Sequence, residues 1–151
     1  MGFRDLTSDE IDLVLASERI VRLSFAANGD VFVVPVFYVW KAGGLHGFTT
    51  PGRKTTMAAA NPLAGFQVDS TVHTGPWEWA SVGGQGAFEV LEDPAEAVGF
   101  AMELGEKLAD APPWAQRALN DRFETLGRLA WRLRPTTLHG RAHGPEEPDT
   151  G

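Results

Sequence analysis

The chain has 151 residues, no cysteine and a formal net charge of -7 at pH 7. This length suits one domain with a single core, and the acidic balance argues against a nucleic-acid binder, which normally presents a basic face to phosphates. The lack of cysteine excludes disulfides and thiolate sites, and no apolar stretch approaches the roughly 18 to 20 residues of a membrane span, so we expect a soluble protein.

The N-terminal segment carries a helix start signal. Thr7-Ser8-Asp9-Glu10 has the spacing of a capping box and precedes apolar residues, which predicts a short helix. Residues 1–10 are polar and acidic and lack the basic start and apolar run of a secretory signal. The cytoplasm is therefore the expected location.

Strand signals dominate from residue 19 to residue 91. Residues 19–27 and 31–40 flank Asn28-Gly29-Asp30, whose turn chemistry predicts a β-hairpin. Because Pro35 lacks the N–H of a strand ladder, we expect an edge strand or a bulge there. Three further strands are predicted over residues 45–49, 63–69 and 79–91.

Helices and a last strand complete the predicted elements. Residues 52–60 form a short helix that stops at Asn61-Pro62, and helices open at Asp93-Pro94 and at Pro112-Pro113. Residues 128–134 alternate charged and apolar side chains and predict a strand that ends before Pro135. Many short strands with glycine turns favour a barrel, with a few helices packed on it.

We divide the chain into one domain, residues 1–142, and a C-terminal tail, residues 143–151. The stretch 144–151 is rich in proline, glycine and acidic residues and has no apolar residue to anchor it. Such a composition predicts disorder.

The segment Thr49-Thr50-Pro51-Gly52-Arg53-Lys54 is suited to hold a phosphate. It combines two hydroxyls, a glycine, the free N–H groups of a helix start and two cations within six residues. The alternative is an ordinary loop in which Thr50 caps the helix and both cations are solvated. The segment is not a Walker loop, and the chain has no GxGxxG.

Other kinds of site find no support. The four histidines are scattered, without an HExxH or His-x-His pattern, so we expect no metal site. No serine lies in a GxSxG elbow, which argues against a serine hydrolase. Trp77, Trp79 and Phe88 are interpreted as core or interface aromatics.

The order of these features is more specific than any one of them. FTTPGRK is followed by ANP, and a W-x-S-V-x-G-x-G stretch begins at Trp79 and leads to Asp93-Pro94. From about Glu10 to Arg141 the chain resembles the FMN-binding split-barrel family, the pyridoxamine 5'-phosphate oxidase-like proteins, and more narrowly small members related to nitroimidazole-resistance proteins.

This resemblance implies a mainly β fold, a split β-barrel of about six antiparallel strands with a few packed short helices. It also implies a homodimer with two flavins at the interface. The flavin phosphate would be held by the threonines and cations of the segment, the ring would lie along the strand that contains Pro35, and the partner subunit would contribute from the strand that begins at Trp79. The residues assigned in this way to cofactor binding are Val34, Pro35, Val36, Phe48, Thr49, Thr50, Arg53, Lys54, Trp79, Ser81 and Gln85.

The activity implied by the resemblance is that of an FMN-dependent oxidoreductase acting on a small organic molecule. The flavin would transfer hydride or electrons, so no side chain is assigned a catalytic role. Alternatives are an F420-dependent reductase of the same fold, a non-catalytic flavin or haem carrier or sensor, and a barrel that has lost its ligand.

Two departures from the family pattern narrow the activity. His46 stands one or two places before the position where many nitroimidazole-resistance-like relatives carry a histidine, which puts that activity in doubt. The basic residues and C-terminal substrate motif of true pyridoxamine phosphate oxidases are not found, so we do not expect the vitamin-pathway reaction.

Overall fold

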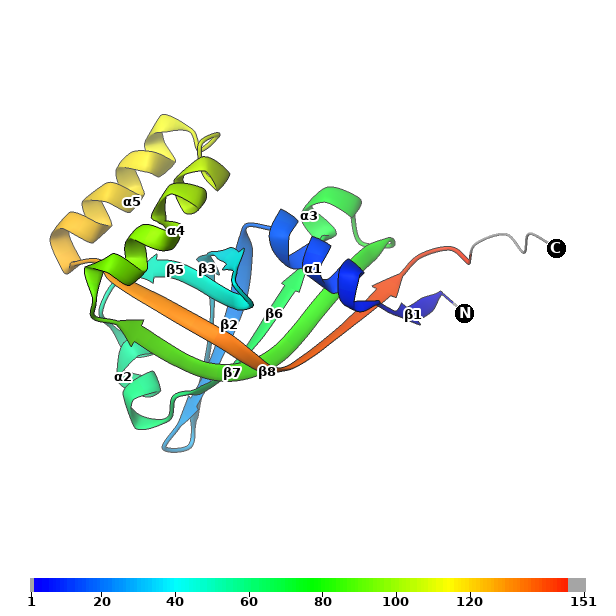
Figure 1. The fold of residues 1–151 in the computed structure, drawn as a ribbon, viewed down its shortest axis with the longest axis horizontal. Helices are drawn as coiled ribbons and strands as arrows, with labels where there is room; N and C mark the ends of the chain where they lie inside the picture. The colour runs from blue at the N-terminus through cyan, green and yellow to red at the C-terminus, as the bar shows by residue number, and fades with distance from the viewer. Residues whose placement is uncertain (1, 147–151) are drawn as a thin grey trace.

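A computed structural model of the chain describes residues 2–146 and arranges eight strands in one curled antiparallel sheet, flanked by five helices (Figure 1). The strands are β1 (Phe3–Asp5), β2 (Ile20–Ala27), β3 (Asp30–Phe37), β4 (Val39–Lys41), β5 (Gly44–Thr49), β6 (Leu63–Asp69), β7 (Trp79–Leu91) and β8 (Leu129–His143). The helices are α1 (Ser8–Ser17), α2 (Arg53–Ala60), α3 (Thr71–Thr74), α4 (Pro94–Lys107) and α5 (Pro113–Leu126). The strand order is β3-β2-β6-β7-β8-β5-β4, and β1 pairs with β8.

The predicted hairpin is confirmed. Asn28 and Gly29 both have positive φ, 52° and 83°, as a tight two-residue turn between twisted strands requires. β3 pairs with β2 alone, in a register without interruption, and Pro35 stands opposite Arg22. Pro35 therefore lies on an edge strand without a bulge, where a missing N–H costs no ladder bond.

The predicted strand over residues 31–40 is two strands, because the chain leaves the sheet edge at Tyr38. The Tyr38 side chain is fully buried, and its hydroxyl donates to the carbonyl of Leu15 at 2.7 Å. The chain then continues as β4 at the opposite edge of the sheet, beside β5. The short strands β4 and β1 raise the count above the six expected.

The sequence predicts a last strand that ends before Pro135. This prediction is wrong, because β8 continues to His143. Gln85 of β7 stands opposite Thr137 and Gly86 opposite Pro135, so Thr136 is an extra residue on β8. The proline thus sits at a β-bulge, one of the few places inside a sheet that tolerate it.

The barrel closes where β3 approaches β5 without a strand ladder between them. A Cβ on Gly47 of β5 would lie 2.6 Å from the Phe37 carbonyl oxygen, so only glycine allows this approach. The enclosed core contains Leu23, Phe25 and Trp131, all fully buried.

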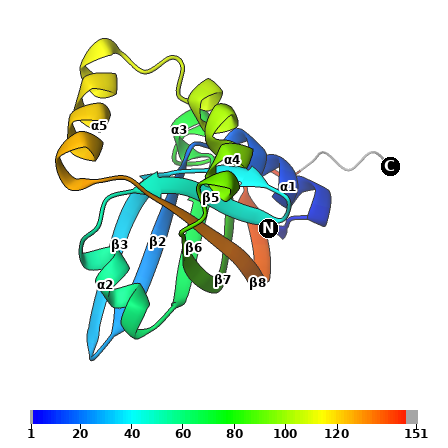
Figure 2. The same cartoon turned by 60° about the vertical axis from the view of Figure 1, so that its left-hand side comes forward.

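α4 and α5 form a helical hairpin beside the end of the sheet where β3 and β5 lie (Figures 1 and 2). α4 packs through Phe100 and Leu104, which are buried against Val39. Val98 and Met102 are 74% and 76% exposed because they lie on the other side of the helix. No helix in residues 2–146 is long and apolar enough to cross a membrane.

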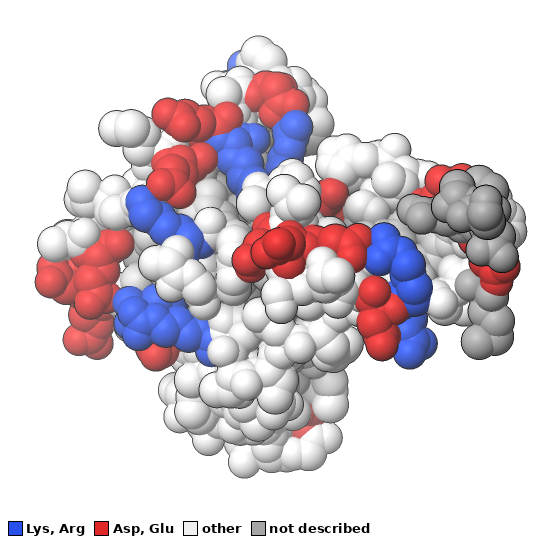
Figure 3. Space-filling model, turned by 45° about the vertical axis from the view of Figure 1, so that its right-hand side comes forward, with Lys and Arg blue, Asp and Glu red and all other residues white. Residues whose placement is uncertain are grey.

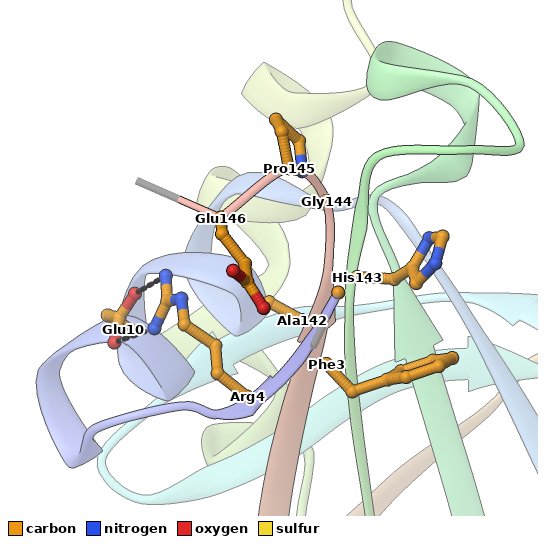
Figure 4. A pocket seen from close by; sticks show the side chains of 9 residues that line it. Phe3, Arg4, Glu10, Ala142, His143, Gly144, Pro145 and Glu146 are labelled. Atoms are coloured by element: carbon orange, nitrogen blue, oxygen red, sulfur yellow. Dashed lines mark hydrogen bonds and ion pairs between the residues drawn. The ribbon is translucent and has the colours of Figure 1, made fainter. Parts of the chain in front are cut away.

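The two ends of the described chain lie side by side. His143 stands opposite Phe3 and Trp79, and the Gly144 N–H donates to the Gly2 carbonyl at 2.9 Å. A hollow of about 690 Å³ lies between β1 and the end of β8, with Arg4 paired to Glu10 at its side (Figure 4). Residues 147–151 of the predicted tail fall outside the described residues.

Candidate functional site

The segment from Thr49 to Lys54 connects the end of β5 to the start of α2. Thr49 and Thr50 are only 6% and 4% exposed, although both are polar. Within residues 2–146, neither hydroxyl has a hydrogen-bond partner. Neither hydroxyl oxygen is closed off from solvent, since Trp131 Nε1 is the one fully buried side-chain polar atom without a partner in the described residues. Both hydroxyls can therefore donate to a ligand with acceptor oxygens.

The start of α2 adds main-chain donors to these hydroxyls. The first N–H groups of a helix have no partner inside it, and here the cap residue is Gly52, which has no side chain to offer them. Thr55 Oγ1 accepts from the Gly52 N–H at 3.0 Å and so closes the first turn. Gly52 has an extended φ of 167°, which any residue can adopt, so its conformation does not demand glycine.

The two cations of the segment have no carboxylate partner in the described part of the chain. The Arg53 guanidinium lies 4.8 Å from the centroid of the Phe32 ring of β3. Lys54 is half-buried, and burial, with a smaller contribution from the positive charge of Arg122, lowers its pKa. An anion bound here would offset both effects.

Two further arginines beside the segment are not predicted by the sequence pattern. Arg122 belongs to α5, and its positive charge lowers the pKa of Lys54. The Arg128 guanidinium lies 4.4 Å from the centroid of the Phe48 ring. A Cβ on Gly127 would lie 4.0 Å from Pro51 Cδ, which places the end of α5 against the segment. With Arg53 and Lys54, four cations thus lie on or beside the segment.

The predicted ring-binding residues lie beside the segment. Val34 and Val36 turn inward and pack against the core, whereas Pro35 is exposed. On the same strand, the Phe32 ring contacts Arg53, and the Phe37 carbonyl lies beside Gly47 of β5. Its free edge leaves main-chain donors and acceptors without strand partners.

The structure does not bring Trp79, Ser81 and Gln85 to the segment within one chain. Phe48 is aligned through Ala130 with Leu91, at the far end of β7 from Trp79. The strand rise of about 3.3 Å per residue makes this separation roughly 40 Å along β7. Trp79 instead stacks on His143, and Ser81 accepts from Gln67 at 3.0 Å.

A second group of titratable residues surrounds the buried Glu18 at the end of α1. Glu18 is 5% exposed, and its burial raises the pKa of the carboxyl, although His73 Nε2 lies 3.1 Å away. Lys107 contacts the Tyr38 ring, 4.4 Å from its centroid, and burial lowers the pKa of its ammonium to about 8.

The lowered pKa of Lys107 makes the free energy of unfolding change with pH in the alkaline range. Between about pH 8 and 10.5 the unfolded chain binds more protons at this lysine than the folded chain, so the free energy of unfolding rises with pH. We expect a rise of about 1 to 2 kcal/mol, reduced by solvent screening of a half-buried group. Urea unfolding at pH 7, 9 and 10.5 measures it. Lys107→Met should remove most of this rise, whereas Lys41→Met should retain it.

We compared the chain with protein families, curated proteins and solved structures. A family model described as pyridoxamine 5'-phosphate oxidase matches residues 7–142. A search among curated proteins finds no match. Among solved structures, the chain is similar to an FAD-binding protein from Mesorhizobium loti, with a TM-score of 0.74 and 26% identity over 95% of this chain and 100% of that one.

Two other solved structures share the fold at lower identity. An FAD-binding protein from Mycobacterium smegmatis has a TM-score of 0.63 and 20% identity over 92% of this chain and 97% of that one. A protein provisionally described as a 5-nitroimidazole antibiotic resistance protein, from Bacteroides thetaiotaomicron, has a TM-score of 0.67 and 15% identity over 94% of this chain and 89% of that one.

Proposed function

Because the chain belongs to the pyridoxamine 5'-phosphate oxidase family, we propose that it is a flavin-dependent oxidoreductase that holds FMN through the segment from Thr49 to Lys54. One observation carries this proposal: two buried threonines without hydrogen-bond partners in the described part of the chain lie at the start of a helix, beside two cations that have no carboxylate partner. A phosphate monoester supplies the acceptor oxygens and the negative charge that this arrangement lacks.

Each part of the site has a separate task in this proposal. The threonine hydroxyls and the first N–H groups of α2 donate to the phosphate, and Arg53 and Lys54 balance its charge. The free edge of β3 around Pro35 offers main-chain groups to the polar edge of the ring. When bound, the flavin supplies hydride or electron transfer, so the side chains of this chain position it and exclude water.

The identity of the flavin is the finer part of the proposal. The Mesorhizobium loti protein is described as FAD-binding, and FAD carries the same riboflavin phosphate unit extended by a nucleotide. F420 is the second candidate, favoured by the four cations near Thr49, since its acidic tail would neutralise more of them than FMN can. All three cofactors carry a phosphate, so the threonines suit each of them.

We further propose that two copies pair through the outer face of β3, β2, β6 and β7. Val31, Val33 and Leu63 are 67%, 59% and 48% exposed on this face. The strand registers align Val33 through β2 and β6 with Gln85, so Gln85 shares the face. Figure 3 shows few charged side chains on the lower part of the molecule, where the β2–β3 hairpin ends (Figure 1). In such a dimer, Trp79, Ser81 and Gln85 of one subunit would serve the flavin of the other.

Titration with FMN, FAD and F420 tests the proposal. We expect tight binding of FMN or FAD, a visible flavin spectrum, and a mass in solution of twice that of one chain. Oxidation of NADH or NADPH with an added acceptor would separate an enzyme from a carrier. A protein that binds none of the three cofactors, before or after refolding with excess cofactor, would refute the proposal.

A further inference from the structure

A cavity of about 480 Å³ lies under the N-terminal half of α5, outside the segment that we assign to the phosphate. Its walls are Phe37 of β3, Leu108 and the α5 residues Trp114, Ala115, Ala118 and Leu119. These side chains are all apolar. The charged residues at the cavity, Arg19 and Asp110, pair with each other at 2.5 Å, so neither presents an uncompensated charge to a ligand.

α5 stands at the side of the barrel rather than on its core (Figure 2). None of its residues is fully buried, and Trp114 is 68% exposed. Residues four apart on a helix share a face, so Trp114, Ala118 and Arg122 form one stripe along α5. The stripe that lines the cavity therefore ends at a cation beside Lys54.

On both β3 and α5, one end lies near the cations of the segment and the other end lines the cavity. On β3, Phe32 lies under Arg53 and Phe37 lines the cavity, five residues and roughly 17 Å further along the strand. On α5, Arg122 lies near Lys54, and Trp114 reaches the cavity about 12 Å away. On β3 the two side chains point to opposite faces, because residues five apart on a strand alternate in direction: Phe32 packs on the core, whereas Phe37 faces outward to the cavity. Val34 to Val36, the proposed place of the flavin ring, lie between Phe32 and Phe37 along the strand, so the cavity begins directly after them.

We propose that this cavity is the substrate pocket and that it takes a planar, uncharged aromatic molecule of about two fused rings. The position of the cavity next to the flavin ring rests on the proposed function, but the binding of an aromatic molecule in the cavity does not. The volume falls within the range of about 300 to 1,000 Å³ that is usual for small-molecule sites. The apolar walls favour an aromatic surface, and a charged ligand would lose hydration without gaining a partner.

Menadione, an uncharged naphthoquinone, is the probe for this pocket. Calorimetric titration of the full chain, without flavin and with saturating FMN, should show binding in both states. Ala118→Trp fills the cavity and should weaken menadione binding at least tenfold with FMN affinity unchanged. Asn120→Trp places the same side chain at an exposed position of α5 that does not line the cavity, and should bind menadione like the wild type.

Several outcomes would overturn the proposal. Two of them are no binding of menadione to the wild type and unchanged menadione affinity in Ala118→Trp. A third is a change in the mass of Ala118→Trp in solution, which would make the cavity an interface between copies. Loss of FMN binding in Ala118→Trp would assign the cavity to the flavin ring itself and would also overturn it. Trp114→Ala, which removes a wall without adding bulk, should weaken menadione binding too, and circular dichroism verifies that each variant folds.

The proposed flavin site is tested separately from the pocket. Arg53→Ala combined with Lys54→Ala should weaken FMN binding at least 100-fold and leave menadione affinity in the flavin-free protein unchanged. A protein that binds menadione in the Ala118-dependent manner but no flavin would refute the proposed function and retain the pocket. The reverse result would refute the pocket alone.

Discussion

Replacing Arg53 and Lys54 together by alanine is expected to weaken FMN binding at least 100-fold. A hydrogen bond to a charged group contributes about 1.5 to 3 kcal/mol, so two of them account for a loss of about 3 kcal/mol or more. The flavin-free variant should be at least as stable as the wild type. Neither cation has a carboxylate partner in the described residues, and both lie at the helix end where positive charge is unfavourable.

Thermal unfolding with and without FMN measures this effect. Ligand at a hundredfold excess over its dissociation constant stabilises the wild type by about 2.7 kcal/mol, and the double variant should show almost none of this stabilisation. Arg117→Ala with Arg134→Ala removes two positive charges from exposed positions elsewhere and should retain it. An equal shift of melting temperature in both double variants and the wild type would assign FMN to another site.

The largest loss of stability is expected from Gly84→Ala, in the middle of β7. A Cβ at this position would lie 2.0 Å from the Thr137 carbonyl oxygen of β8 and 3.0 Å from the Phe66 ring of β6. The oxygen belongs to the main chain of a paired strand and cannot move without breaking the ladder. We expect the free energy of unfolding to fall by about 3 kcal/mol or more, at the upper end of overpacking effects.

Gly99→Ala is the matched control for this substitution. Gly99 lies on an exposed turn of α4, and a Cβ there would meet no atom within 4 Å. Alanine in place of glycine inside a helix should raise the free energy of unfolding by about 0.5 to 1 kcal/mol. Urea unfolding measures both variants. Equal stability of Gly84→Ala and the wild type would mean that β7 and β8 do not cross as closely as described.

The positions of most elements follow from local signals in the sequence. The capping box at Thr7 and Glu10 forms with both of its hydrogen bonds, and α1 begins at Ser8. Asn28-Gly29 forms the tight turn of the β2–β3 hairpin. Such signals suffice because they act through bonds between residues only a few positions apart.

Long-range pairing explains where the predictions failed. Pro35 lies on an edge strand, one of the two places predicted for it, whereas Pro135, predicted to follow the last strand, lies at a bulge in an inner strand. Which neighbour a strand finds depends on residues far away in the chain. The break at Tyr38 has the same origin, since its hydroxyl donates to Leu15 on a different element.

The sequence by itself predicted an anion-binding role for Thr49 to Lys54, because hydroxyls, cations and a helix start are contiguous there. Only the tertiary structure decided that both threonine side chains are mostly buried without hydrogen-bond partners in the described residues, that Arg122 and Arg128 stand beside the segment, and that α5 lines an apolar cavity at the other end of β3. Burial and electrostatic proximity depend on which distant segments meet in space. In this fold, Arg122 of α5 reaches Lys54 from about 70 positions further along the chain.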